Sequence, residues 1–215
     1  MLNKSKGNMY NFVTHTWNPI RGKCPHDCKY CYMKRFPVGE LRLDEKSLKD
    51  NLGKDNFIFV GSSTDMFADK VPKEWIAKVL NHCMKFDNKY LFQTKNPRMF
   101  HNCIFPKKVI FGTTLESNRL YPEYSHAPFI DERVRMMKIL KYKKTMISIE
   151  PVMDFDTKQF INIIKEISPK FVSIGADSKG HNLPEPSAEK VEALIKKLKK
   201  FTEVKIKTNL KRLFS

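Results

Sequence analysis

Short apolar runs alternate with longer amphipathic stretches along the chain. Each run is about four to seven residues long and rich in Val, Ile and Phe, as expected for strands of a parallel sheet that is buried on both faces. The predicted strands cover residues 12–17, 57–61, 90–94, 109–113, 145–149 and 171–175, with 204–207 as a seventh.

The stretches between the strands carry apolar residues at the spacing of one helical face. Val191, Leu194 and Leu198 follow the 3.6-residue period, and Ser187 precedes them as a suitable N-cap. Pro72 suits the first turn of an earlier helix. The predicted helices cover residues 71–86, 131–142, 156–167 and 188–200.

This repeated strand–helix order predicts a parallel α/β architecture with right-handed crossovers. Six or seven units in 215 residues are too few for a complete eight-fold barrel, which usually takes about 250 residues. We therefore expect a partial, open barrel. No linker, low-complexity segment or repeat divides the sequence, so residues 1–215 are expected to form a single domain.

Polar residues gather where the predicted strands end. Any one of these groups could be ordinary turn chemistry. Five successive groups instead predict one polar mouth at the carboxyl edge of the sheet, where parallel α/β folds bind ligands. The groups cover residues 61–65, 94–96, 113–116, 148–151 and 175–178.

Composition narrows the class of protein. Hydrophobic residues make up 41% of the chain, which is typical of a globular protein. No apolar run approaches the roughly 18 residues of a membrane span, and the N-terminal residues lack the apolar stretch of a signal peptide. We expect a cytoplasmic protein that does not bind membranes.

The formal net charge of +17 creates a field that attracts phosphates and favours nucleic acid. Abundant Lys, Asn, Ile and Phe are also what an AT-rich genome produces without selection for binding. The sequence thus leaves two interpretations of the charge open: a polyanionic partner such as DNA, RNA or a nucleotide, or compositional drift.

Three of the five cysteines lie within eight residues, as Cys24, Cys28 and Cys31. An odd count and a tight cluster favour a metal site in a reducing compartment over a secreted disulfide framework. Thiolates are the usual ligands of iron–sulfur clusters. Three of them on one loop can hold three corners of a 4Fe-4S cluster and leave the fourth iron open.

Two other metal sites could use the same cysteines. A zinc site takes four ligands, and His26 would be the fourth, but ligands at 24, 26, 28 and 31 would crowd a single metal. A conventional ferredoxin needs a fourth cysteine at familiar spacing, and Cys83 and Cys103 stand far apart from the motif. The open-iron cluster is the favoured interpretation.

The Cys-x3-Cys-x2-Cys motif, with Tyr30 before its last cysteine, resembles the signature of the radical S-adenosylmethionine (SAM) superfamily. The resemblance implies that the open iron binds the amino and carboxylate groups of SAM. It also implies that the reduced cluster cleaves SAM to a 5′-deoxyadenosyl radical, which abstracts hydrogen from a substrate. An external electron donor of the flavodoxin or ferredoxin type would supply the electron.

The resemblance extends over nearly the whole chain, to a small radical SAM group that phages and mobile elements often encode. It implies a partial (β/α)6 barrel. The matching motifs cover residues 16–19, 60–62 with 65–67, 93–97, 111–116 and 148–151. The chain departs from the family at 175–180, where Ala176 and Asp177 replace a glycine and a glutamate, and at 61–63, where Gly-Ser-Ser stands in place of Gly-Gly-Glu.

Roles follow for the predicted SAM site. Cys24, Cys28 and Cys31 are the expected cluster ligands, and Tyr30 is expected beside the adenine, where an aromatic face offers stacking area. The remaining candidates lie at the strand ends. They are Ser62, Ser63 and Asp65 near the methionyl group, Thr113 and Glu116 near the ribose or the methionine carboxylate, and Lys95 on that carboxylate or a substrate phosphate.

Ser148 and Glu150, at another strand end, complete the candidates for cofactor binding. We expect them to point to opposite faces of their strand, so that at most one points inward unless the strand bends.

The candidates for substrate contact are fewer. Asp177 keeps a carboxylate in the altered family motif. Tyr121 and Tyr124 lie in a loop rich in aromatics, where they could stack on a base.

The sequence thus favours a monomeric radical SAM enzyme acting on a nucleotide or nucleic-acid base, through modification, rearrangement or repair. Two alternatives stay open. One is a radical SAM enzyme that acts on a peptide or small metabolite. The other is a non-enzymatic iron–sulfur protein that binds nucleic acid or senses redox state without cleaving SAM.

Overall fold

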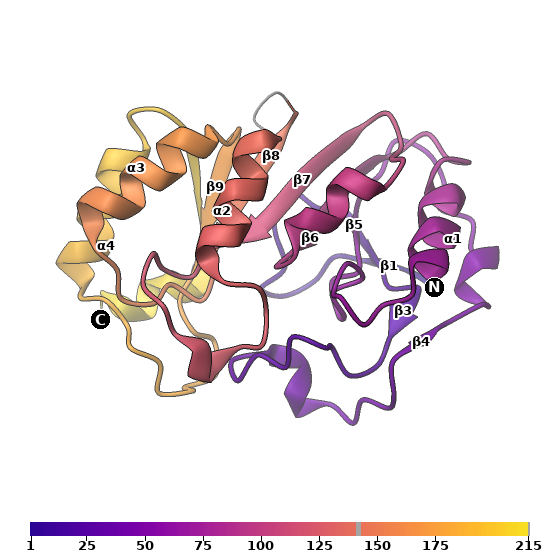
Figure 1. The fold of residues 1–215 in the computed structure, drawn as a ribbon, viewed down its shortest axis with the longest axis horizontal. Helices are drawn as coiled ribbons and strands as arrows, with labels where there is room; N and C mark the ends of the chain where they lie inside the picture. The colour runs from indigo at the N-terminus through magenta and orange to yellow at the C-terminus, as the bar shows by residue number, and fades with distance from the viewer. Residues whose placement is uncertain (141–142, 215) are drawn as a thin grey trace.

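The computed structural model describes residues 1–140 and 143–214, and a single mostly parallel sheet forms its centre (Figure 1). In spatial order the strands are β1 (Leu2–Lys4), β2 (His15–Trp17), β5 (Phe57–Val60), β6 (Lys89–Thr94), β7 (Val109–Thr114), β8 (Thr145–Ile149), β9 (Phe171–Ile174) and β10 (Glu203–Ile206). From β2 to β10 every neighbouring pair is parallel, and β1 alone is antiparallel. The edge strands β1 and β10 do not pair with each other, so the predicted partial barrel is confirmed.

Four α-helices connect successive strands. All four predicted helices are confirmed with slightly shorter bounds: α1 (Lys73–Cys83), α2 (Ile130–Ile139), α3 (Thr157–Ile167) and α4 (Ala188–Leu198). Residues 141 and 142, the predicted end of the second helix, lie outside the described residues. Ser187 caps α4 as expected, because its side chain accepts a hydrogen bond from the backbone N–H of Lys190 at 3.3 Å. None of the helices in the described residues is both long and apolar enough to cross a membrane.

The remaining connections are short and irregular. The segment from β2 to β5 forms a small antiparallel pair, β3 (Ile20–Arg21) with β4 (Arg42–Leu43), and the 3-10 turns η1 (Tyr32–Arg35) and η2 (Ser47–Lys49). A 3-10 turn, η3 (Pro97–Asn102), joins β6 to β7, and η4 (Pro122–Tyr124) precedes α2. The last element is η5 (Thr208–Leu213). Cys24, Cys28 and Cys31 therefore lie on the connection from β2 to β5, in its part between β3 and η1.

Alternate residues of each strand enter two separate hydrophobic clusters, as the pleat of a sheet requires. On the outer face, Ile58, Phe92 and Ile147 pack with helix residues such as Ile76 and Phe160. On the inner face, a ring of five strand residues fills the interior of the barrel, formed by Phe59, Leu91, Ile110, Met146 and Phe171. Both faces are buried, which explains why the strands are almost continuously apolar in sequence.

The N-terminal segment plugs this interior, which corrects the predicted strand at 12–17. The strand begins only at His15, because Tyr10, Phe12 and Val13 turn away from the ladder and pack on the inner ring. Phe12 stacks on Tyr10 at a centroid distance of 5.0 Å and meets the edge of Phe171 at 4.9 Å. Burial of these side chains outweighs continued strand pairing. Strand β1 was not predicted.

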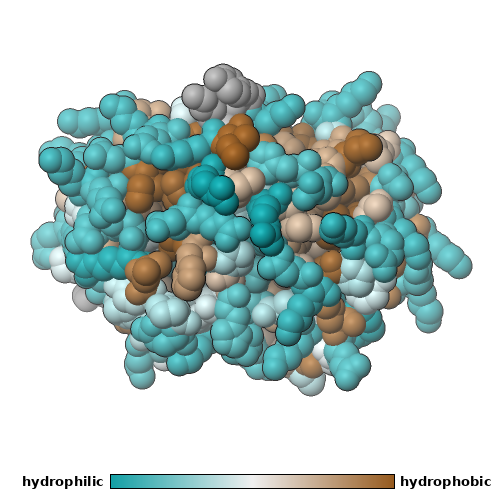
Figure 2. Space-filling view, in the orientation of Figure 1, coloured by the Kyte–Doolittle hydropathy of each residue, from teal (hydrophilic) through white to brown (hydrophobic). Residues whose placement is uncertain are grey.

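The polar ends of the strands and the irregular connections lie together at the carboxyl edge of the sheet, along the lower side of Figure 1. The surface on this view is mostly hydrophilic, with several separate hydrophobic patches (Figure 2). Apolar groups are therefore local features of this face.

Removing the plug should weaken the whole barrel. We expect Phe12→Ala to lower the free energy of unfolding by about 3 kcal/mol, since the stacked ring leaves a cavity against Phe171. Phe36→Ala is the matched control, because that ring is 45% exposed, and it should change stability by less than about 0.5 kcal/mol. Denaturant unfolding measures both; equal effects would show that residues 10–13 do not support the core.

Candidate functional site

A cavity of about 590 Å³ opens at the carboxyl ends of the strands. All five predicted polar groups contribute to its wall, so the predicted polar mouth is present as one site. The contributing residues include Ser62, Ser63, Asp65, Thr94, Lys95, Thr114, Ser148, Glu150 and Asp177.

Cys24, Cys28 and Cys31 line this same cavity. Tight turns fold the loop around them: the Asp27 N–H donates to the Cys24 carbonyl at 3.1 Å, and the Cys31 N–H donates to the Cys28 carbonyl at 3.1 Å. Asp27 has a positive φ of 43°, a conformation that Asp tolerates better than most residues. These turns keep the motif compact beside the cavity.

Two of the three thiols are protonated at neutral pH in the metal-free protein. Burial raises the pKa of Cys24 to about 12 and also raises the pKa of Cys31, so a bound metal would have to displace these protons. The other two cysteines lie elsewhere, Cys83 buried in α1 and Cys103 after η3. Three of the five cysteines thus line the cavity.

The zinc alternative does not fit this geometry. Among the residues that the structure describes, no three His, Cys, Asp or Glu side chains, the three cysteines included, are grouped as ligands of a single metal ion. His26 lines the cavity but its Nε2 donates to Asp65 Oδ2 at 2.9 Å. The histidine inside the cysteine motif is therefore engaged with a carboxylate.

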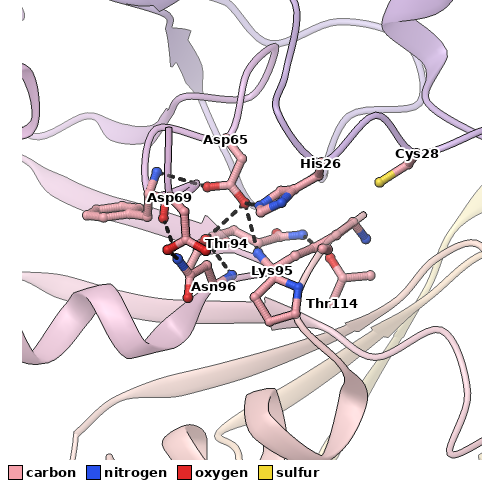
Figure 3. Close-up of polar contacts among 12 residues, drawn as sticks. His26, Cys28, Asp65, Asp69, Thr94, Lys95, Asn96 and Thr114 are labelled. Atoms are coloured by element: carbon pink, nitrogen blue, oxygen red, sulfur yellow. Dashed lines mark hydrogen bonds and ion pairs between the residues drawn. The ribbon is translucent and has the colours of Figure 1, made fainter. Parts of the chain in front are cut away.

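Asp65 is a buried connection between the cysteine loop and the sheet (Figure 3). Besides His26, its Oδ2 accepts hydrogen bonds from the Thr94 hydroxyl at 2.9 Å and the Lys95 N–H at 2.8 Å, and its Oδ1 accepts from the Phe67 N–H at 3.0 Å. Burial would raise the pKa of Asp65, but His26 and the two N–H donors outweigh it and lower that pKa. Asp65 stays ionised and ties the end of β6 to the loop after β5 and to the cysteine motif.

Glu116 is a second buried connection, on the other side of Cys28. Its Oε1 accepts hydrogen bonds from the Tyr30 hydroxyl and the Lys95 ammonium, and its Oε2 accepts from Arg133 of α2 at 2.9 Å. Burial alone would raise the pKa of Glu116, but the charges of Lys95 and Arg133 lower it to about 2. Burial and Glu116 raise the pKa of Tyr30, so the phenol remains protonated and donates.

The two carboxylates therefore hold residues 26 and 30, which flank Cys28 in the sequence. Lys95 joins them, because its backbone N–H binds Asp65 and its ammonium binds Glu116. The Lys95 ammonium also lies 5.3 Å from the centre of the Tyr30 ring. Sequence reasoning assigned neither His26 nor Arg133 to the site, since neither belongs to a strand-end group.

The loop after β7 covers the outer side of the cysteine motif. Ser125 Oγ lies 3.1 Å from the Cys28 thiol, and the Lys29 N–H donates to the Tyr124 carbonyl at 2.8 Å. Tyr121 and Tyr124 make an edge contact at 6.2 Å and line a small pocket of about 40 Å³, together with Glu116. They lie beside the large cavity but do not line it.

Ser62 and Ser63 lie at the end of β5, held by one side chain. Asn18 Oδ1 accepts from the Ser62 hydroxyl at 3.1 Å and from the Ser63 N–H at 3.0 Å. The Tyr32 hydroxyl donates to the Ser62 carbonyl at 2.7 Å. The residue after Cys31 is thereby fixed to the end of β5.

The expectation for Ser148 and Glu150 is wrong. Both line the cavity, because residues two apart on a strand share a face, while Ile149 between them is buried in the outer cluster. Ser148 forms a hydrogen bond with the Tyr10 hydroxyl at 2.8 Å, and Gln93 Oε1 lies 2.9 Å from the same hydroxyl. Tyr10 and Gln93 thus extend the polar layer above the apolar ring, and the position of Tyr10 could not be read from strand periodicity.

Glu150 is held by basic and amide groups from the C-terminal part of the chain. Lys207 pairs with its Oε2 at 2.8 Å, and Asn209 Nδ2 donates to its Oε1 at 3.0 Å. Gly175 leaves room for this arrangement, since a Cβ there would lie 2.9 Å from Glu150 Oε1. A side chain at 175 would displace the carboxylate from the cavity wall.

The strand pleat also corrects the expected position of Thr113. Its side chain is fully buried and donates to the Thr94 carbonyl at 2.7 Å, while its neighbour Thr114 lines the cavity. Asp177 does line the cavity, and its carboxylate accepts hydrogen bonds from the His181 N–H and ring and from the Lys179 N–H. These bonds fold the loop after β9 back on itself.

No protein-family profile and no curated protein sequence matches this chain. Several solved structures share its fold. A variant of spore photoproduct lyase with bound AdoMet and dinucleoside spore photoproduct has a TM-score of 0.67 at 10% identity, and the match covers 94% of this chain and 78% of that chain.

Streptococcus suis SuiB bound to S-adenosylmethionine has a TM-score of 0.61 at 12% identity, over 89% of this chain and 49% of that chain. SuiB bound to precursor peptide SuiA gives a TM-score of 0.63 at 12% identity. This chain spans about half the length of SuiB. At these identities the similarity establishes the shared fold.

The Glu116 connection has a testable pH signature. Its folded-state pKa of about 2 lies below the ordinary value of 4.5, so ionised Glu116 stabilises the fold above pH 4.5 and loses this effect as the pH falls toward 2. Glu116→Gln should cost about 3–5 kcal/mol at pH 7, because Lys95 and Arg133 would remain buried without their counter-charge. The difference from the wild type should shrink below pH 4.5 in urea unfolding.

Glu45→Gln provides the control for this prediction. Glu45 pairs with Lys78 at 2.9 Å on the surface, where both side chains are more than half exposed, and its loss should cost less than about 1 kcal/mol. A Glu116 variant no less stable than this control would show that the buried network does not stabilise the fold.

Proposed function

We propose that this protein is a radical SAM enzyme, with Cys24, Cys28 and Cys31 holding a 4Fe-4S cluster and S-adenosylmethionine bound in the adjoining cavity. The observation that carries the proposal is that these three cysteines of one motif all line a polar cavity at the strand ends. The shared fold supports it, since both spore photoproduct lyase and SuiB are known with S-adenosylmethionine bound.

The bound cluster and SAM would together supply a 5′-deoxyadenosyl radical able to abstract hydrogen from a substrate. The protein's own contribution is to position and shield. Asp65 and Glu116 fix the cysteine motif through His26 and Tyr30. Ser125 and the loop around it cover the outer side of Cys28.

For SAM itself we propose contacts with the part of the cavity wall that lies closest to the cysteine motif. Ser62 and Ser63 would face the methionyl group, with Lys95 close to its carboxylate, and the Tyr30 ring would lie near the adenine. The Lys95 charge is already compensated by Glu116, so Lys95 would act chiefly as a hydrogen-bond donor. Asp65 already binds protein partners, so it would contribute by holding the cysteine loop in place and not by contacting SAM.

We propose a nucleotide or nucleic-acid base as the substrate. Gln93, Ser148 and Thr114 offer amide and hydroxyl groups around the floor of the cavity, the kind of donors and acceptors that read the edge of a base. The net charge of +17 favours a phosphate-bearing substrate. Spore photoproduct lyase, with the same fold, holds a dinucleoside.

A peptide substrate is the second candidate, because SuiB with the same fold binds a precursor peptide. We further propose a cytoplasmic setting and an external reductant of the flavodoxin or ferredoxin type.

The third alternative is a non-enzymatic iron–sulfur protein. Such a protein would bind the cluster without cleaving SAM, so SAM cleavage distinguishes it from both enzyme candidates.

Anaerobic reconstitution tests the enzyme assignment. The cluster-loaded protein, given SAM and dithionite, should form 5′-deoxyadenosine, and Cys28→Ala should lose both the iron–sulfur absorbance and the product. Cys103→Ala is the matched control, because Cys103 lies outside the cavity and should keep both. Equal product from wild type and Cys28→Ala would refute a cluster-dependent reaction.

The substrate class needs a separate measurement. Incubation with DNA, RNA, nucleotides and peptides, followed by mass analysis of digested nucleosides and intact peptides, should reveal a changed nucleoside that depends on SAM. A changed peptide with unchanged nucleosides would favour the second candidate.

A further inference from the structure

Five basic side chains line the cavity, and they fall into two groups. Lys95 and Lys207 are partly buried and paired with Glu116 and Glu150. The other three are exposed, and no carboxylate in the described residues lies within ion-pair distance of them. We call these three the basic rim: Lys6, Arg35 and Lys179.

The basic rim comes from three separate parts of the chain. Arg35 ends η1 on the side of the cysteine motif. Lys6 and Lys179 lie on the side of β9, where Asn8 Nδ2 is 3.3 Å from Ser178 Oγ. Positive charge therefore flanks the cavity on two sides.

The acids of the cavity do not neutralise this rim. Asp65 is bound by His26, Glu150 by Lys207, and Asp177 by its own loop. An anion that bridges the mouth would meet three cations already in place. Successive phosphates of a nucleic-acid strand carry the repeated negative charge that such a divided set of cations suits.

Flat apolar surface accompanies the charge. Tyr32 and Phe36 are 39% and 45% exposed beside Arg35, and the Arg35 guanidinium lies 4.7 Å from the centre of the Phe36 ring. A cationic track combined with exposed aromatic rings is the arrangement that binds single-stranded nucleic acid, through phosphate contacts and base stacking.

We propose that the basic rim binds the phosphates on either side of one nucleotide in a single-stranded or locally unpaired nucleic acid, while its base enters the cavity. The inference rests on the proposed function in that the base is the group presented to the SAM site. A paired base cannot reach the cavity floor, because it must first leave the stack. Free nucleosides lack the phosphates that the rim would hold.

Binding of a fluorescent oligonucleotide of about 12 nucleotides to the cluster-loaded protein tests the rim. Each phosphate contact steepens the logarithmic salt dependence of single-strand binding by about 0.7. The triple variant Lys6→Gln, Arg35→Gln, Lys179→Gln should therefore have a slope shallower by about 2. Three contacts also correspond to about a 20-fold difference in affinity between about 50 and 200 mM salt.

A second triple variant removes the same charge from the opposite end of the barrel. Lys89, Lys144 and Lys170 are exposed at the amino ends of β6, β8 and β9. Changing all three to Gln should alter the salt slope by well under 1, because these residues lie away from the mouth. Melting temperatures of both triple variants confirm that they are folded.

Three results would overturn the proposal: equal slopes for the two triple variants, duplex bound as tightly as the single strand, or displacement of the oligonucleotide by an equimolar acidic peptide. The last would point to a protein partner. Deoxyadenosine formation is measured separately on the wild type. Rim-dependent binding without deoxyadenosine would refute the proposed function and keep the rim, and deoxyadenosine without rim-dependent binding would refute the rim alone.

Discussion

Two buried carboxylates determine how this molecule presents its cysteines. Asp65 binds His26, Glu116 binds Tyr30, and both bind Lys95 at the end of β6. A loop rich in turns has little packing of its own, so its position depends on these charge-assisted bonds, which are stronger than bonds between neutral groups. Burial of each carboxylate is costly by itself, and each is compensated by cations and N–H donors from separate elements.

The partial barrel makes this arrangement possible. Parallel strands deliver Asp65, Lys95 and Glu116 to one edge, and the pleat sends apolar residues into two clusters below that edge. Because the barrel is open between β1 and β10, its interior needs another cover, which Tyr10, Phe12 and Val13 provide. The same N-terminal segment carries Lys6 and Asn8 to the mouth, so closing the core and building the cavity wall are linked.

Charge is distributed in the cavity by depth. The partly buried cations, Lys95 and Lys207, are paired with carboxylates and stabilise the fold. The basic rim is exposed and has no such partners in the described residues. Deep pairs resist salt screening, and exposed cations remain available to an external anion. This division separates the proposed SAM site from the proposed phosphate contacts.

The sequence by itself determined the four α-helices, the parallel strands from β5 to β10 and the cysteine motif, because these depend on local spacing. Continuous apolar runs marked the strands, the 3.6-residue period marked the helices, and the three thiols lie within eight residues. The short strands β1, β3 and β4 carry no such pattern. Only the tertiary structure decided which polar side chains meet. His26 and Asp65 are 39 residues apart, Tyr30 and Glu116 are 86 apart, and Tyr10 and Ser148 are 138 apart. Likewise Thr114, and not Thr113, reached the cavity, since a shift of one residue reverses the face. Local periodicity fixes an element, but long-range partners depend on how the elements pack.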